Sequence, residues 1–234
     1  ENYNTAFGYG ALGGPIAGGE LNVAVGNNAL DALTSGDNNV AVGYDAGTGL
    51  TTGHRNTLMG QGAGSLLTTG THTVAIGNAA ASGYDTETHN IAIGHVALGG
   101  SVAGGEYNVA VGNYTLDALT SADQNTVVGY QSGSAVTTGG SNAFLGYQTG
   151  LANTTGYDNV FIGNKAGLVN TTGHDNTGVG AEAGMDTTTG SNNTFLGTEA
   201  GRASSPTQVT TGSNRVVVGN NSVTNCDIKV DWTV

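Results

Sequence analysis

The chain has few charged residues and a single cysteine. Five lysine and arginine residues stand against 17 aspartate and glutamate residues, and charged types make up only 9% of the 234 residues. A nucleic-acid-binding protein needs a basic face, so we expect no nucleic-acid partner. The lone Cys226 excludes an intrachain disulfide framework. No apolar run reaches the 18 residues of a membrane span, so we expect no membrane insertion.

Patterns typical of helices, disorder and collagen are also missing. No unit of the sequence offers eight or more residues at helical spacing. Disordered chains carry more charge and less valine, isoleucine and alanine than this one. Collagen needs glycine at every third position, and the 42 glycines do not follow that spacing. The glycines must therefore serve another regular structure.

A glycine recurs along the whole chain at a nearly constant interval. Nine of the twelve intervals are 17 residues long, two are 18 and the last is 22. The residue before each glycine is large and apolar, the third residue after it is small, and asparagine stands four residues before it in eleven of the thirteen units. Such a period is the signature of a repeat architecture. The thirteen glycines are Gly8, Gly26, Gly43, Gly60, Gly77, Gly94, Gly112, Gly129, Gly146, Gly163, Gly180, Gly197 and Gly219.

A longer period overlies the 17-residue period. The segment "ALGGPIAGGELNVAVGNNALDALTSGD", from Ala11, returns as "ALGGSVAGGEYNVAVGNYTLDALTSAD", from Ala97, 86 residues later. This distance is five units, one of which carries an extra residue. It indicates the duplication of a five-unit block.

Each unit predicts a short strand, a glycine, a second short extended piece and a turn that is usually Thr-Thr-Gly. One such unit cannot bury its own apolar face, but stacked units bury a continuous core. The sequence therefore predicts an all-β parallel β-roll, or β-solenoid, of about thirteen 17-residue coils over residues 1–223. Because stacked strands lie about 4.8 Å apart, the rod would be roughly 60 Å long.

The two faces of the predicted strand are both apolar. We expect the large residue before each glycine, such as Val25 or Val42, to point into the coil. The residue before it would then face outward, where alternation predicts polar side chains. Its column instead carries alanine and phenylalanine, so the strand either meets another subunit or lies between two layers of one flattened roll. We favour a trimer interface at Ala24, Ala41, Phe144, Phe161 and Phe195.

Histidines and carboxylates do not form a recognisable catalytic pattern. His54 and His174 stand two residues before the repeat asparagine position, and His72 and His89 stand one before it. Three chains meeting at that turn could ring a metal with imidazoles, but solvated turn residues fit this polar context better. We expect no metal site and no cofactor.

The carboxylates are scattered over turns. Asp31 and Asp117 are repeat mates, and Asp85 and Glu87 lie near each other. None stands at a catalytic spacing from a base or nucleophile, and a polysaccharide-cleaving enzyme would need paired carboxylates in a groove. We therefore expect no catalytic residues and no enzymatic activity.

Two further columns suggest surface roles. Threonine pairs begin at positions 51, 68, 137, 154, 171 and 188, and regular threonine arrays resemble ice-binding faces. Each pair precedes a turn glycine rather than lying in mid-strand, which disfavours an ice-binding function. A second column of tyrosines follows the repeat glycine and either stacks on a surface glycan or forms a structural ladder. These tyrosines are Tyr9, Tyr44, Tyr130 and Tyr147.

The repeat unit resembles the YadA-like head of trimeric autotransporter adhesins. "TVAIGNAAAS" (73–82) and "NIAIGHVAL" (90–98) match its pattern most closely. The resemblance covers nearly all of residues 4–223 and implies a left-handed parallel β-roll packed as a homotrimer. The 17-residue unit is longer than the family's head repeat, so the loop shape and the coil diameter do not carry over.

The C-terminal sequence resembles parts of phage tail fibres. "NRVVVGNNSVTNCDIKVDWTV" (214–234) looks like the segment before an endosialidase-type intramolecular chaperone, and "NNTFLGTEAG" (192–201) is of a type familiar from phage fibres. The resemblance implies that residues 224–234 form a tail leading to a chaperone domain that trimerises the fibre and is cleaved off, with Val234 near the cleavage point.

Together with the repeat pattern, the two resemblances imply a homotrimeric phage tail-fibre or spike segment that attaches to a host surface without catalysis. Its partners would be copies of itself, other fibre segments and a glycan or protein receptor on the host cell. Its location would be the virion or a cell surface. A bacterial trimeric adhesin of the autotransporter or phage-derived type is the alternative.

Overall fold

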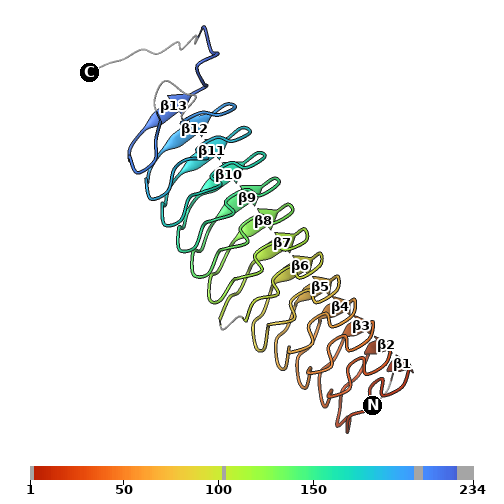
Figure 1. Cartoon of the computed structure of the whole chain (residues 1–234). Coiled ribbons are helices and arrows are strands. Elements are labelled where there is room, and N and C mark those ends of the chain that lie inside the picture. The colour runs from red at the N-terminus through yellow and green to blue at the C-terminus, as the bar shows by residue number, and fades with distance from the viewer. Residues whose placement is uncertain (1–2, 102–103, 203–207, 226–234) are drawn as a thin grey trace.

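The structure, a computed structural model, describes residues 3–101, 104–202 and 208–225. Thirteen parallel strands form one sheet in chain order and stack along a rod, with β1 at one end and β13 towards the other (Figure 1). The described residues contain no helix, and hence no helix able to span a membrane. The predicted all-β solenoid is confirmed. The strands are β1 (Thr5–Phe7), β2 (Val23–Val25), β3 (Val40–Val42), β4 (Thr57–Met59), β5 (Val74–Ile76), β6 (Ile91–Ile93), β7 (Val109–Val111), β8 (Thr126–Val128), β9 (Ala143–Leu145), β10 (Val160–Ile162), β11 (Thr177–Val179), β12 (Thr194–Leu196) and β13 (Val216–Val218).

The interval between repeat glycines sets the register of the sheet. Val23 pairs with Val40, one 17-residue unit later, and Thr194 pairs with Val216 across the 22-residue unit. Each unit therefore contributes one three-residue strand, and the pairing stays in register across the longer units as well. The second extended piece predicted for each unit is not a strand in the described residues, where turns follow the glycine instead.

The repeat glycine ends each strand for two physical reasons. Gly43 has a φ of 138°, which side chains with a Cβ rarely adopt, and a Cβ there would lie 2.6 Å from the carbonyl oxygen of Gly60 in the next coil. The chain then turns through left-handed residues such as Asp45, at φ 55°, and Gly47, at φ 59°. The coil corner thus needs glycine at the first position and tolerates other residues later.

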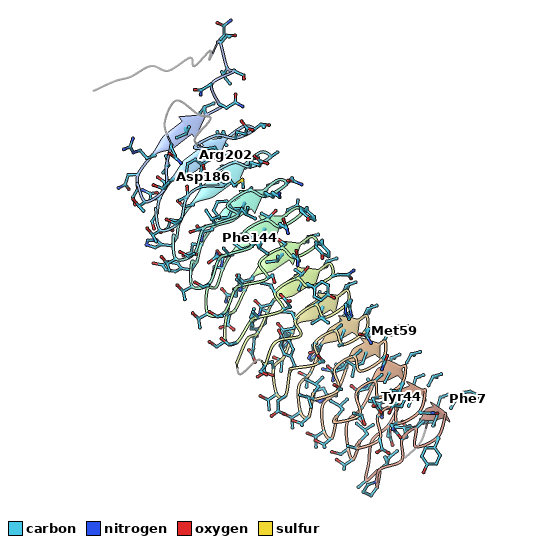
Figure 2. The ribbon with its side chains drawn as sticks, in the orientation of Figure 1. Phe7, Tyr44, Met59, Phe144, Asp186 and Arg202 are labelled. Carbon is cyan, nitrogen blue, oxygen red and sulfur yellow. The ribbon has the colours of Figure 1, made fainter. Side chains whose placement is uncertain are left out.

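The strand faces are the reverse of those predicted from the sequence. The middle residue of β2 to β13 is buried, whereas the residues on either side of it are half-buried or exposed. Figure 2 shows Phe7 and Met59 projecting away from the coil, and they are 77% and 39% exposed. The residue before each glycine, including Val25 and Val42, therefore points outward and not into the core.

The residues predicted to form a trimer interface lie inside the coil. All five are at most 1% exposed in the single chain, where the turns of their own and neighbouring coils cover them. They have no surface left to offer another subunit, so this assignment is wrong. The corrected residues are Ala24, Ala41, Phe144, Phe161 and Phe195.

Several coils exchange bulk between two facing core positions, although others, such as that of Gly178 and Gly184, have a small residue at both. Coils with alanine in mid-strand carry a large side chain six residues later in several cases, as with Ala24 and Leu30, both fully buried. Coils with phenylalanine in mid-strand carry glycine there instead. A Cβ on Gly150 would lie 2.6 Å from the Phe144 ring, so only glycine fits opposite that ring.

The asparagine column is a buried ladder that joins the coils. Its side chains are at most 1% exposed from Asn22 to Asn193, with Thr73 in place of asparagine in one coil. Most of these amides bond to the asparagine of the preceding coil and to a turn carbonyl of the following coil, as Asn39 does with Asn22 and Gly53. The ladder satisfies polar groups that the turns would otherwise bury without partners.

The predicted division between a repeat region and a tail falls near the end of the described chain. Strand β13 is followed by a turn in which the backbone N–H of Val223 donates to the carbonyl oxygen of Asn220. Residues 226–234, which hold most of the predicted tail, lie outside the described residues. The boundary at residue 223 stays a prediction.

Candidate functional site

The outer face of the sheet is mainly apolar: the column before the repeat glycines is apolar throughout, and the column at the start of the strands carries threonine in five of the thirteen strands. Two outward residues per strand contribute to it, and most are valine, isoleucine or leucine. Leu145 is 49% exposed and Ile162 is 39% exposed. Sequence analysis recognised an uncovered apolar column but assigned it to the wrong side of the strand. The column before the glycines is Phe7, Val25, Val42, Met59, Ile76, Ile93, Val111, Val128, Leu145, Ile162, Val179, Leu196 and Val218.

This apolar surface has a hollow over β8 to β10. The hollow has a volume of about 220 Å³, and its lining is almost wholly apolar. Ala143 on β9 has the smallest side chain of the lining, and its partners on the neighbouring strands are Thr126 on β8 and Val160 on β10. The remaining lining residues are Val128, Phe144, Leu145 and Ile162.

The four tyrosines predicted as surface contacts are all exposed, but they do not form one continuous ladder. Tyr130 and Tyr147 stack at a ring distance of 5.6 Å and an interplanar angle of 10°, so each covers one face of the other. Tyr44 is 51% exposed, and its neighbours in the column are Asn27 and Gln61. Tyr9 lies at the end of the rod and is 85% exposed. Tyr130 and Tyr147 therefore fit the interpretation as a structural ladder, whereas Tyr9 and Tyr44 fit the interpretation as ligand contacts.

Aromatic and imidazole rings stack along the edge where the chain enters the strands. The His72 and His89 rings stack at 4.8 Å, and the His89 ring stacks on Tyr107 at 5.0 Å. The Nη1 atom of Arg55 lies 3.4 Å from His72 Nε2. Partial desolvation lowers the pKa of His72, and the nearby His89, Arg55 and His54 lower it further.

The stacked geometry does not suit metal chelation. Imidazole lone pairs lie in the ring plane, so those of two parallel stacked rings stay in separate planes and do not converge on one ion between them, and in both histidines Nδ1 lies within hydrogen-bond distance of the preceding threonine hydroxyl. Among the described residues, no group of three or more histidine, cysteine, aspartate or glutamate side chains could hold a metal ion. His174 belongs to a different stack, with Tyr157 at 4.7 Å.

Two of the carboxylates singled out in the sequence, Glu87 and Asp117, accept hydrogen bonds from turn residues. Glu87 is 3% exposed, and its carboxylate accepts hydrogen bonds from the backbone N–H groups of Asp85, Thr86 and Gly104 at 2.8–3.0 Å. Asp117 accepts a hydrogen bond from the Ser134 hydroxyl one coil later. These contacts give Glu87 and Asp117 a structural role.

A buried tyrosine lies beside Glu87. Tyr84 is fully buried, and its hydroxyl has no hydrogen-bond partner in the described part of the chain. Burial raises the pKa of this hydroxyl, and the charges of Glu87 and Asp123 raise it further. The hydroxyl therefore stays neutral over the ordinary pH range.

The threonine pairs lie in the turns and bond to the backbone of the next coil. The hydroxyl of Thr51 donates to the carbonyl oxygen of Thr68 at 3.1 Å, and Thr154 donates to Thr171 at 3.0 Å. The flat sheet face instead carries mainly valine, isoleucine and leucine. The hydroxyl of the first threonine of each pair therefore forms a hydrogen bond between neighbouring coils. It does not belong to an ordered array of free hydroxyls, as an ice-binding face would require.

A groove lined mainly by polar residue types, although most of the surface it exposes is apolar, lies beside Tyr44 and was not predicted from the sequence. It has a volume of about 220 Å³ and runs over three successive coils. Three repeat positions line it: the residue after the repeat glycine, the next residue, and the fifth residue after that glycine. Small side chains at these positions in neighbouring units were the sequence pattern from which the groove could have been predicted. The lining residues are Tyr44, Asp45, Thr48, Gln61, Gly62, Ser65, Asn78, Ala79 and Ser82.

Comparison with known proteins finds no matching family model, no matching curated protein and no matching solved structure. The features that bear on function are therefore two surfaces, the apolar sheet face and the groove beside Tyr44, and the resemblance of the repeat units to trimeric adhesin heads.

Proposed function

We propose that the chain is a segment of a homotrimeric phage tail fibre or spike that attaches to a host-cell surface without catalysis. The observation that carries this proposal is the apolar outer face of the sheet. Thirteen strands about 4.8 Å apart, each with three residues of about 3.3 Å, give a face of about 600 Å². This is the upper end of the range for the largest apolar patch on a monomer, about 300–600 Å².

Packing three copies side by side would cover this face along the whole rod. The choice of three copies rests on the resemblance of the repeat units to trimeric head repeats. The same resemblance supports the second candidate, a bacterial trimeric surface adhesin. The two candidates differ in gene neighbourhood and not in the assembly of this segment.

A rod of this kind suits attachment because it repeats its surface. Three parallel chains present each exposed side chain three times, and simultaneous weak contacts multiply their effect. The chain carries a formal charge of −12, and many cell surfaces are anionic too. Long-range attraction is therefore absent, and contact depends on short-range hydrogen bonds and stacking.

The assembly is tested by light scattering on the purified chain. The expected mass is three times 23.1 kDa. A double substitution, Leu145→Asp with Ile162→Asp, puts two carboxylates into the proposed interface and should give monomers, because burying unpaired charges costs several kcal/mol. Leu66→Asp is the matched control, since Leu66 is 61% exposed and lies in a turn away from the sheet. A monomeric wild type, or a double variant that stays trimeric, would refute the trimer.

Attachment is tested with fluorescently labelled protein on a panel of bacterial strains. We expect binding to some strains and not to others, and this binding should survive 0.5 M salt because it does not depend on long-range charge. Binding to no strain would overturn the attachment function. Binding that disappears with added salt would show that the contact is electrostatic and that the short-range mechanism is wrong.

A further inference from the structure

The groove beside Tyr44 combines an exposed aromatic ring with hydrogen-bonding groups that the protein does not use. The hydroxyls of Thr48, Ser65 and Ser82 make no hydrogen bond within the described residues, and the groove also carries amide and carboxylate groups. Such a set can stack against a ring and exchange hydrogen bonds with several hydroxyl groups at once.

The amide and carboxylate groups on the other lining positions are only partly used. Asn78 Nδ2 donates to Gln61 Oε1 at 3.2 Å, which leaves the Gln61 Nε2 donors without a partner in the described chain. Asp45 Oδ1 accepts from Asn28 Nδ2 at 3.0 Å, and its second oxygen remains available. The groove therefore offers both donors and acceptors around one aromatic ring.

Open space lies over the middle coil of the groove. Gly62 has a φ of 65°, and a Cβ added there would meet no atom within 4 Å. Ala79, at the same position one coil later, also has a small side chain. Because the lining spans three coils, the groove extends over about 10 Å along the rod.

The duplicated half of the chain shows what the groove looks like when it is filled. The position of Gly62 is taken 86 residues later by Gln148, and that of Ser65 by Leu151. Gln148 Nε2 donates to Gln131 Oε1 at 2.9 Å, so these two larger side chains bond to each other at positions held by Gly62 and Asp45 in the first half. The same scaffold therefore carries small side chains beside the tyrosine column in one half and larger side chains at the corresponding positions in the other.

We infer that the groove lined by Tyr44, Asp45 and Gln61 binds a neutral saccharide. The ring of Tyr44 stacks on a sugar ring, and the free amide, hydroxyl and carboxylate groups bond to its hydroxyls. The Asp45 carboxylate, on a chain of charge −12, disfavours acidic sugars. This inference rests on the proposed attachment function, for which it names a ligand class.

The direct test is saturation-transfer NMR on the purified chain with lactose, cellobiose, maltose and chitobiose as neutral probes and sialyllactose as the acidic probe. We expect transfer to at least one neutral disaccharide and at least tenfold weaker binding in Gly62→Gln and in Tyr44→Ala. Gly62→Gln reproduces the residue of the filled half, so the fold should tolerate it. Gln148→Asn is the matched control in the filled half and should bind as the wild type does.

Several results would overturn the saccharide site. They are transfer to none of the neutral disaccharides, unchanged binding in Gly62→Gln, equal loss in Gln148→Asn, or preference for sialyllactose. Circular dichroism and light scattering on each variant exclude unfolding or altered assembly as the cause of lost binding. A Gly62→Gln protein that still binds cells as the wild type does would overturn the groove as the attachment site and leave the proposed fibre function intact.

Discussion

Asn159 donates its side-chain amide to Asn142 Oδ1 at 3.1 Å and to the carbonyl oxygen of Gly173 at 2.8 Å, and its own Oδ1 accepts the backbone N–H of Asn176 at 3.0 Å. One side chain therefore connects the coils on both sides of it. All of these groups are buried, so water cannot replace a lost bond without opening the coil.

Substitutions of Asn159 should lower the free energy of unfolding in proportion to the number of hydrogen bonds that are lost. Asn159→Ala leaves buried donors and acceptors unpaired in both neighbouring coils, and we expect a loss of about 3 kcal/mol in the free energy of unfolding. Asn159→Asp should cost more, because a carboxylate oxygen would face two acceptors in a dry site. Denaturant unfolding followed by circular dichroism measures both. Asn164→Ala, at an exposed position of the same coil, is the control and should change stability by less than about 0.5 kcal/mol.

Thr73 interrupts the asparagine ladder, and the substitution Thr73→Asn should complete it. Its hydroxyl is buried without a partner in the described structure, although its backbone N–H still donates to Asn56 Oδ1. Asparagine at this position would reach the carbonyl oxygen of Glu87, as Asn56 reaches that of Gly70. We expect Thr73→Asn to stabilise the protein by about 1 kcal/mol.

A thermal melt of Thr73→Asn beside Thr73→Val checks this expectation. Thr73→Val removes the unpaired hydroxyl without completing the ladder, so it separates the two contributions. A melting temperature for Thr73→Asn below that of Thr73→Val would show that the ladder does not extend through this coil.

Two glycines of neighbouring coils should respond very differently to alanine. Gly43→Ala introduces a Cβ at an unfavourable φ and against the Gly60 carbonyl, so we expect a loss of about 3 kcal/mol or failure to fold. Gly62→Ala adds a Cβ into open space at a φ that alanine already adopts at Ala79, at φ 53°. It should cost at most about 1 kcal/mol. Comparable midpoints of denaturation for the two variants would contradict the steric account of the repeat glycine.

Stability should depend on pH through His72. Its pKa is lowered in the folded chain by desolvation and by neighbouring His89, Arg55 and His54, so below about pH 6.5 the unfolded chain binds the proton more readily. The folded state therefore loses stability as the pH falls through this range and keeps it above. The melting temperature of His72→Gln should fall less between pH 8 and pH 5 than that of the wild type. Equal decreases would show that His72 does not contribute.

The sequence predicted the period, the strand register and the fold class, because the glycine spacing reflects a steric requirement at one backbone position. It did not settle which side of the strand faces the core. Both sides are apolar, and a three-residue strand is too short for alternation to distinguish them. The sequence pattern that indicates the core side is the complementary size of two residues six positions apart in one coil, as in Phe144 with Gly150 and Ala24 with Leu30. Only positions that face each other in the core require such complementary sizes.

The polar groove was harder to predict than the fold. Its lining comes from three coils, and no single unit carries a motif for it. Tyr44 was recognised because it recurs in a column with other tyrosines, but the open space beside it depends on Gly62 and Ser65 in the next coil. Only the stacking of the coils brings these positions together.

The direction of the hydrogen bonds between coils decides how the rod responds to pulling. In-register parallel pairing from β1 to β13 places these bonds along the length of the rod, so axial tension loads them in series and each coil interface bears the full force. A single chain pulled from its ends would peel one coil at a time, at the low force that breaks a few bonds together. A shaft under drag would therefore gain tensile strength from chains bound laterally along its whole length, since breaking it then requires many coils to part at once.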